Sequence, residues 1–367
     1  MNFNKHFFIL FFLVTVLFYS CDTDMTDNDD DSYDRSLILS NWSNNIITPA
    51  YNEFYNSLYS LNQDVNLFVN NPSVDHLVNL SSSWIYSYKI WQHIEMFDIG
   101  LAEVINFKGK MNIYPTDVEL INNNILSQNY DLNNNNNFDA RGFPAIDYLI
   151  HGLAETNEEI VQFYINDNSY SNYLSSVVST MMYNTDLIID DWLLYSNDFI
   201  NSTDNTATSS LNKMINDFIY YFEKGLRANK IGIPAGIFSN NPIPTAVEGY
   251  YKKDISKELA LEALSASRNF FIGKHFTSDI TDSSLDSYLN FLDVSSDINL
   301  SEIIILQFLE AENQLNQLND NFVEQITTNN MEMLLTYDAI QQLVVSFKVD
   351  MLQALSISVD YVDADGD

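Results

Sequence analysis

The chain has 367 residues, of which 16 are Lys or Arg and 50 are Asp or Glu, so its formal net charge is −34. So few basic residues cannot assemble a surface for a nucleic acid backbone, and we expect no nucleic acid partner. A single cysteine excludes an internal disulfide. The core must therefore be held by packing, for which the 14% of aromatic residues provide ample material.

Residues 1–20 have the features of a secretory signal peptide. Lys5 is their only formal charge, an apolar stretch covers 7–19, and Cys21 follows directly. This arrangement is typical of a bacterial lipoprotein that carries its lipid on Cys21. It predicts a cell-envelope protein anchored to the outer membrane, on the periplasmic or the surface face. The alternative is an uncleaved N-terminal anchor with an incidental cysteine.

Residues 21–35 are predicted to form an acidic, disordered tether between the lipid and the folded part. The stretch CDTDMTDNDDDSYD has too little apolar surface to fold by itself. It resembles the acidic export tags that send some lipoproteins to the cell surface, and a simple solvated spacer is the alternative.

The remaining chain is predicted to be all-α. Apolar residues recur at helical spacing near both ends of the chain, and Gly and Pro are scarce. Only 357–362 has a strand-like pattern. The polar stretch 197–210 predicts a boundary between two packed helical bundles, at 36–200 and 205–362. A long loop is expected at 229–249, and Ser73 is expected to cap a helix that follows it.

The segment 83–100 places two acids at the end of an aromatic helix face. Trp84, Tyr88 and Trp91 follow each other at steps of four and three, and the next steps reach Glu95 and Asp98. A buried carboxylate needs a partner or a cation. The pattern therefore predicts a carboxylate site at the mouth of a bundle, unless the stripe emerges into solvent at this point.

A second candidate pair lies in DARGFPAIDYLIHG, residues 139–152. Pro144 suits the first turn of a helix, and Asp147 and His151 then share one helix face. The two side chains are expected either to contribute to a metal site or to hydrogen-bond to each other. The upstream stretch 131–142 is spaced like half of a calcium loop, but it lacks the glycine and the glutamate of that motif, which favours an ordinary loop.

Several segments together resemble the imelysin family, the insulin-cleaving membrane peptidases and iron-regulated proteins, in its lipoprotein-borne branch. The segment WQHIEMFDIG matches that family's W-x-x-x-E-x-F-x-x-G pattern through Trp91, Glu95, Phe97 and Gly100. DARGFP falls where the family has G-x-H-x-x-E, and the likeness covers about 34–367. The resemblance implies two helical bundles, a site between them, export and a link to iron uptake.

The motif is altered in this chain at the positions that the family's metal chemistry needs. Gly142 is kept, but Pro144 stands in place of the histidine and Asp147 in place of the glutamate. Proline cannot ligate a metal, and the sequence has no H-E-x-x-H. The alteration argues against metallopeptidase activity and leaves binding compatible with the resemblance.

Three functions remain open from the sequence. The favoured one is a binding protein for iron acquisition, with Glu95, Asp98, Asp147 and His151 near the junction of the bundles. In it, Glu95 and Asp147 lie close together and hold iron or another divalent or trivalent metal. The others are a metallopeptidase of the imelysin type and a surface interaction protein without a small ligand. An outer-membrane receptor for iron uptake is an expected partner.

Overall fold

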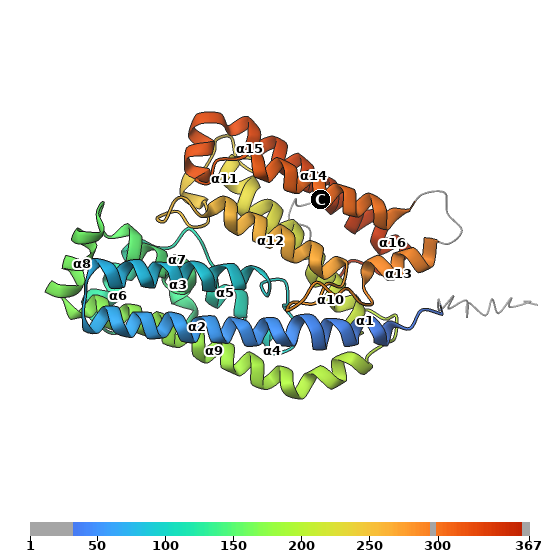
Figure 1. Cartoon of the computed structure of the whole chain (residues 1–367), viewed down its shortest axis with the longest axis horizontal. Helices are drawn as coiled ribbons and strands as arrows, with labels where there is room; N and C mark the ends of the chain where they lie inside the picture. Colours follow the sequence, from blue (N-terminus) through green and yellow to red (C-terminus); the bar gives the residue numbers. More distant parts are fainter. Residues whose placement is uncertain (1–31, 294–298, 362–367) are drawn as a thin grey trace, which may run out of the picture. The chain divides into compact units, whose positions relative to one another are not determined.

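The structure, a computed structural model, describes residues 32–293 and 299–361 (Figure 1). The predicted signal peptide and Cys21 lie outside these ranges, as does most of the predicted tether. The described residues from Tyr33 onward belong to one compact unit. No helix in the described ranges combines the length and the apolar character needed to cross a membrane.

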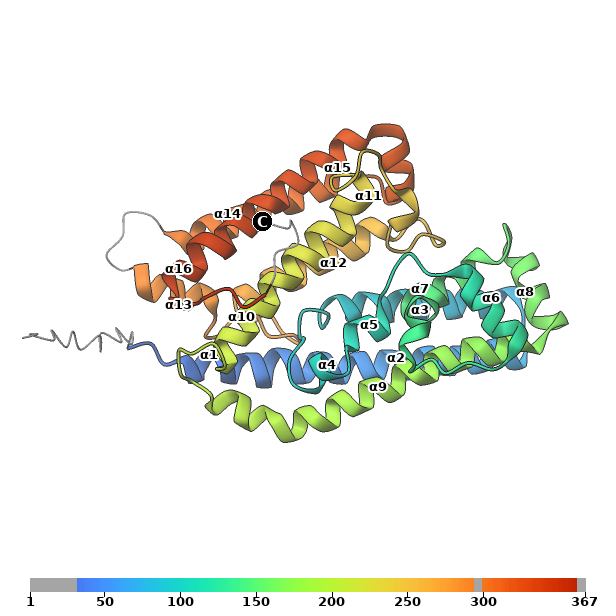
Figure 2. The same cartoon turned by 180° about the vertical axis from the view of Figure 1, so that it is seen from behind.

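The first half of this unit is built around three long helices, one of which carries the aromatic face of Trp84, Tyr88 and Trp91. α2 packs against α3 and against α9, and α1 continues through the π-helical turn η1 into α2. Figures 1 and 2 show α2 and α9 side by side. The elements in chain order are α1 (Arg35–Asn41), η1 (Trp42–Ile47), α2 (Thr48–Asn70), α3 (Val74–Gln92), α4 (Leu101–Val104), α5 (Phe107–Met111), α6 (Val118–Ser127), η2 (Asn135–Ala140), α7 (Gly142–Asp147), η3 (Tyr148–Gly152), α8 (Asn157–Asn166) and α9 (Asn168–Asn201).

The second half is also built from packed helices, mainly α10 with η4, α12, α14 and α15. α14 packs against α15 and α12, and the π-helical segment η4 packs against α15. The elements are α10 (Ser210–Tyr220), η4 (Tyr221–Gly232), α11 (Ile233–Ala235), η5 (Pro244–Ala246), α12 (Ser256–Phe271), α13 (Leu285–Leu292), α14 (Leu300–Gln317), α15 (Phe322–Val345), η7 (Ser346–Met351) and α16 (Leu352–Ala354).

The all-α prediction is confirmed, because the described residues form helices and no strand; an isolated bridge joins Lys274 and Thr281. The strand-like stretch at 357–362 is wrong over its described part, 357–361, which is irregular. The expected loop at 229–249 is wrong in part, because 229–232 completes η4 and short helical turns follow. Ser73 does cap α3, accepting a hydrogen bond from the His76 amide.

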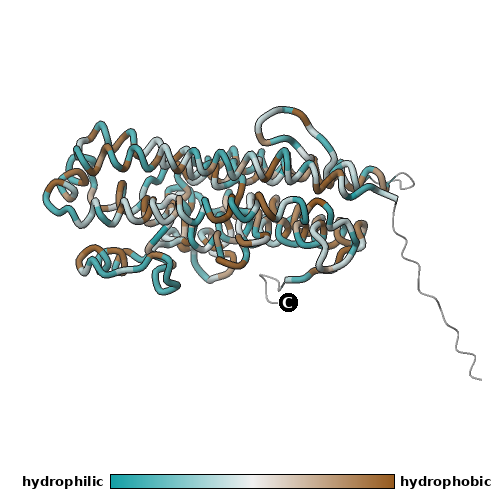
Figure 3. Tube along the Cα trace, turned by 90° about the horizontal axis from the view of Figure 1, so that it is seen from below, coloured by the Kyte–Doolittle hydropathy of each residue, from teal (hydrophilic) through white to brown (hydrophobic). Residues whose placement is uncertain are grey.

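The two halves meet along α3 and α12. These helices are in contact, and Lys89 Nζ lies 2.7 Å from Glu258 Oε1 while His93 Nε2 lies 2.7 Å from Glu262 Oε1. The chain passes between the halves in the polar segment 202–209, where α9 has ended and α10 begins. Hydrophobic and hydrophilic residues alternate along the long helices in Figure 3, as expected for helices that each bury one face.

Candidate functional site

The aromatic face of α3 leads directly to Glu95. Trp84, Tyr88 and Trp91 are fully buried. α3 ends at Gln92, and a turn in which the Glu95 amide donates to the Trp91 carbonyl carries the chain onward. The Glu95 side chain is 12% exposed, so the stripe does not end in bulk solvent.

A buried lysine faces two carboxylates at this point. Lys230 Nζ of η4 lies 2.6 Å from Glu248 Oε2 and 3.9 Å from Glu95 Oε2. The Asn112 amide donates to Glu248 Oε1 at 2.8 Å and to Glu95 Oε1 at 3.5 Å. Lys230 and Glu248 are each only 2% exposed. One ammonium thus serves two carboxylates, which leaves an excess of negative charge inside the protein. With Tyr221, these four residues are called the junction cluster below.

The electrostatics of Glu95 follow from that imbalance. Burial raises the pKa of Glu95 to about 7, with Lys230 opposing the increase and Glu248 adding to it. Burial, together with the Glu95 and Glu248 charges, also raises the pKa of the Tyr221 phenol well above its ordinary value. Glu95 can therefore take up or release a proton near neutral pH, whereas Tyr221 stays a neutral hydroxyl.

The junction cluster borders a cavity of about 250 Å³, to which Glu95, Asn112 and Tyr221 contribute. Its wall also includes Lys108 and Lys224. The Tyr221 hydroxyl is buried and finds no hydrogen-bond partner among the described residues, and the same holds for Glu95 Oε2. Buried polar atoms normally have partners, so these two mark a position where a polar ligand atom would be satisfied.

Asp98 lies beside this cavity rather than in it. Its Oδ2 is 2.5 Å from Lys108 Nζ, and Lys108 is one of the cavity residues. Of the predicted acids on the α3 stripe, Glu95 therefore borders the cavity directly and Asp98 contributes by placing a lysine there.

Asp147 and His151 form the hydrogen-bonded pair that their spacing predicts, with His151 Nδ1 2.9 Å from Asp147 Oδ1. The backbone amides of Tyr251 and Lys252 also donate to the Asp147 carboxylate, each at 2.9 Å. Asp147 is 2% exposed and has both oxygens engaged. It borders a different cavity, of about 230 Å³, together with Pro144 and Tyr114.

Glu95 and Asp147 are linked through one short segment. Glu248 joins the junction cluster, and the Tyr251 and Lys252 amides a few residues later hold Asp147. The two carboxylates share neither a ligand-like partner nor a cavity, and in the described part of the chain no three His, Cys, Asp or Glu side chains are grouped to hold a metal. The metal site predicted at Glu95 and Asp147 is not confirmed by this arrangement.

The other residues of the two motifs shape the local backbone. Trp91 and Phe97 are buried. Gly100 has φ +60°, and Gly142 has φ +73°, where a Cβ would meet the Met111 carbonyl oxygen at 2.1 Å. Pro144 lies in the first turn of α7, as predicted. These residues place Glu95 and Asp147 and offer no ligand atoms of their own.

The stretch 131–142, spaced like half of a calcium loop, is held by its own hydrogen bonds. The Asn133 amide donates to Asp131 Oδ1, and the buried Arg141 guanidinium donates to the carbonyl oxygens of Leu132 and Gly109. A cationic guanidinium that is hydrogen-bonded to a carbonyl oxygen of this stretch favours the ordinary loop.

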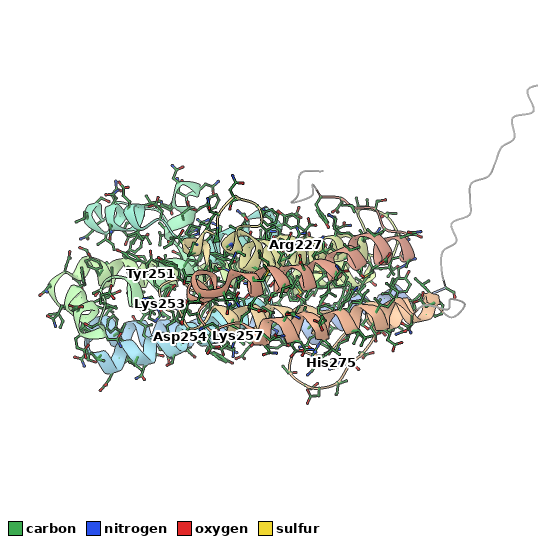
Figure 4. The ribbon with its side chains drawn as sticks, turned by 90° about the horizontal axis from the view of Figure 1, so that it is seen from above. Arg227, Tyr251, Lys253, Asp254, Lys257 and His275 are labelled. Carbon is green, nitrogen blue, oxygen red and sulfur yellow. The ribbon has the colours of Figure 1, made fainter. Side chains whose placement is uncertain are left out.

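Lys230, Glu248, Asn112 and Tyr221 are the residues that sequence reasoning missed. Their partners lie far away along the chain, so no local spacing indicates them. The local signal is the segment 229–249, which contains Lys230 and Glu248 and is predicted to form a loop. Figure 4 shows that Tyr251, in the segment that follows, lies well apart from Arg227 of η4.

The described residues define an all-helical protein with a buried polar cluster where its two halves meet. The family model for imelysin, Peptidase_M75, matches residues 47–348, and the chain therefore belongs to the imelysin family. No curated protein matches the chain.

Two solved structures are similar in fold. A Parabacteroides distasonis protein named as an iron-regulated protein A precursor has a TM-score of 0.72 at 16% identity, over 88% of this chain and 94% of its own. An imelysin-like protein from Psychrobacter arcticum has a TM-score of 0.69 at 16% identity, over 88% and 96%. At this identity the likeness shows the fold alone.

Proposed function

We propose that this chain is an exported binding protein for iron acquisition, carried on the outer membrane by a lipid on Cys21. The ligand site is the cavity beside the junction cluster. The observation that carries the proposal is that two buried polar atoms at the edge of a 250 Å³ space, Glu95 Oε2 and the Tyr221 hydroxyl oxygen, have no hydrogen-bond partner among the described residues. The iron-regulated name of one structural neighbour supports the link to iron.

The charges favour a chelated ion over a bare one. Lys230 already occupies the position beside Glu95 and Glu248 that a metal ion would need. Lys108 and Lys224 line the same cavity and attract anionic groups, while Glu95 and Tyr221 suit hydroxyl groups. A small anionic chelate of ferric iron, with carboxylate and hydroxyl groups, matches this set of donors and acceptors.

The acidic surface is the second element of the proposal. A formal net charge of −34 favours contact with a basic partner surface. We propose that an iron-uptake receptor of the outer membrane presents such a surface and receives the ligand from the lipid-anchored protein.

Calorimetry tests the proposed site. The full chain, purified in detergent, is titrated with ferric citrate and separately with free zinc and calcium. Ferric citrate is expected to bind, and Glu95→Gln is expected to weaken it at least tenfold, which is about 1.4 kcal/mol. Glu119→Gln, the same change at an exposed position, is the matched control. An unchanged affinity in Glu95→Gln, or binding of the bare metals alone, would remove the proposal.

A further inference from the structure

Three side chains from different elements of the first half form a continuous hydrogen-bonded line. Ser81 Oγ of α3 lies 2.8 Å from His151 Nε2 of η3, and His151 Nδ1 lies 2.9 Å from Asp147 Oδ1 of α7. The neighbouring Ser82 instead donates to the Val78 carbonyl of its own helix. Ser81 is therefore directed at the imidazole and not at its own helix backbone.

The hydrogen bonds fix the roles of the two imidazole nitrogens. Asp147 accepts from the Tyr251 and Lys252 amides, so it is an acceptor toward His151 as well. His151 Nδ1 then carries the proton, and Nε2 presents its lone pair to the Ser81 hydroxyl. This is the tautomer that a general base needs when it takes a proton from a serine.

The surroundings hold this geometry in place. The Trp84 ring packs edge-on against the His151 ring, with 5.1 Å between centroids, and Trp84 Nε1 donates to the Phe143 carbonyl at the start of α7. His151 lies in a π-helical turn, a form that recurs at functional sites. The base is thus fixed from one side by Asp147 and from another by an indole.

Ser81 and His151 open onto the wall of a cavity of about 440 Å³, a volume suited to a small organic molecule. The wall combines apolar side chains with a few polar ones: Leu77, Val78, Ile85, Ile160, Asn157 and Lys252. This cavity is separate from the one beside the junction cluster and is not used by the proposed binding function.

We propose that Ser81 is a nucleophile for acyl transfer, with His151 as its general base and Asp147 as a positioning residue, and that the substrate is a small ester with an apolar acyl group. Ser81 Oγ attacks the ester carbonyl carbon and its proton passes to His151 Nε2. The bond to the alkoxy oxygen then breaks, and that oxygen leaves with the proton. Water, activated by His151, hydrolyses the acyl-serine and restores the hydroxyl.

In this proposal, the backbone amides in the first turn of α8 are the donors for the developing oxyanion. Asn157, its first residue, lines the cavity. The Thr156 hydroxyl accepts from the Glu159 amide, and no acceptor inside the helix can reach the amides of Asn157 and Glu158. These two amides are therefore free to donate to a carbonyl oxygen bound in the cavity that Asn157 lines.

Covalent labelling separates a nucleophile from a serine that only ties two helices together. The full chain in detergent is treated with a fluorophosphonate probe, and the modified residue is located by mass spectrometry. Hydrolysis of p-nitrophenyl butyrate is followed in parallel. Ser81→Ala is expected to abolish labelling and to reduce turnover at least about a hundredfold, and His151→Gln is expected to act similarly. Ser82→Ala, on the same cavity wall, is expected to change neither.

Two further variants keep the test decisive. In Ser81→Cys, a thiol beside His151 is expected to react with iodoacetamide faster than the same thiol in a Ser81→Cys, His151→Gln double variant. Asp147→Asn is expected to lower kcat with little change in KM and to shift the pH profile. The absence of a label on Ser81 in folded protein, or equal thiol reactivity in the two cysteine variants, would overturn the proposal.

Discussion

η4 carries two buried ionic clusters that are built in opposite ways. In the first, Glu223 lies 3.5 Å from Arg227 Nη2 and 3.0 Å from Lys348 Nζ, so two cations surround one carboxylate. In the second, the junction cluster, Lys230 serves both Glu95 and Glu248. The first cluster lies within the second bundle, whereas the second lies where the two halves meet and borders a cavity.

This difference is the basis for proposing that the first cluster contributes to stability and that the second is available for binding. Arg227 is fully buried, also donates to Gln341 and lies over the Tyr337 ring at 5.3 Å. Its hydrogen-bonding capacity is directed at the protein itself. Glu95 instead has a raised pKa and an oxygen without a hydrogen-bond partner among the described residues. A carboxylate left in that state gains most from a ligand.

The largest effect on stability is expected at the cluster formed by Glu223, Arg227 and Lys348. Arg227→Met should lower the free energy of unfolding by about 3 kcal/mol, because Glu223 keeps Lys348 but loses the buried guanidinium, and Gln341 loses its charged donor. Arg268→Met is the control, since Arg268 and Glu312 lie 3.0 Å apart but are partly exposed, and their pair should contribute less than about 1 kcal/mol. Urea unfolding followed by tryptophan fluorescence measures both. Equal losses in the two variants would remove the distinction between the clusters.

A smaller, pH-dependent effect is expected at the junction cluster. The folded-state pKa of Glu95, about 7, lies above its ordinary value of 4.5, so folding favours the protonated carboxyl. Its contribution to stability is present below pH 4.5 and is lost as the pH rises to about 7. Between pH 4.5 and pH 8, the free energy of unfolding of the parent protein should therefore fall by about 2–3 kcal/mol relative to that of Glu95→Gln, which has no carboxylate to ionise at this position.

The measurement is urea unfolding of both proteins across that pH range. Asp217, whose pKa burial raises to about 8, shifts stability in the same direction, but it is present in both proteins and cancels in the difference. Glu119→Gln, at an exposed site, should give a difference that does not change with pH. A constant difference in Glu95→Gln as well would mean that Glu95 titrates in its ordinary range.

The parts of the fold predicted from sequence are those that depend on local order. Helical periodicity and the Ser73 cap follow from residues close together in the chain, whereas α9 continues to Asn201, into the polar stretch 197–210 that is predicted as a boundary. The hydrogen bond of Asp147 to His151 belongs to the same class, since it joins residues one helical turn apart.

The site was only half predictable, because its partners come from tertiary contacts. The α3 stripe indicated that Glu95 would need a partner, but Lys230 and Glu248 come from the second half, and Ser81 gave no signal in sequence at all. A metal is predicted between Glu95 and Asp147, whereas in the structure Glu95 lies beside Lys230 and Asp147 is bound by His151 and two backbone amides. Cation and lysine satisfy the same electrostatic need, and spacing cannot distinguish them.

The smallest effects on stability are expected for two tyrosines at the junction cluster, Tyr88 and Tyr221. Tyr88 and Tyr221 are both buried beside it, but only the Tyr88 hydroxyl donates, to Asn112 Oδ1 at 2.5 Å. Tyr88→Phe should cost about 1–2 kcal/mol of stability, whereas Tyr221→Phe should be neutral or slightly stabilising, since it removes a buried hydroxyl that has no hydrogen bond to lose. Thermal unfolding of the ligand-free variants measures this contrast.

The two tyrosines should rank the other way round for ligand affinity, with the larger loss in Tyr221→Phe. If the Tyr221 hydroxyl is kept for a ligand, Tyr221→Phe should weaken ferric citrate about tenfold while leaving the free protein intact. Tyr88→Phe should weaken ferric citrate binding less than Tyr221→Phe does, because the Tyr88 hydroxyl donates to Asn112 and Tyr88 does not line the cavity. A loss of stability in Tyr221→Phe equal to that in Tyr88→Phe would show that its hydroxyl is satisfied within the protein. The cavity would then lose the buried group that most clearly marks it as a binding site.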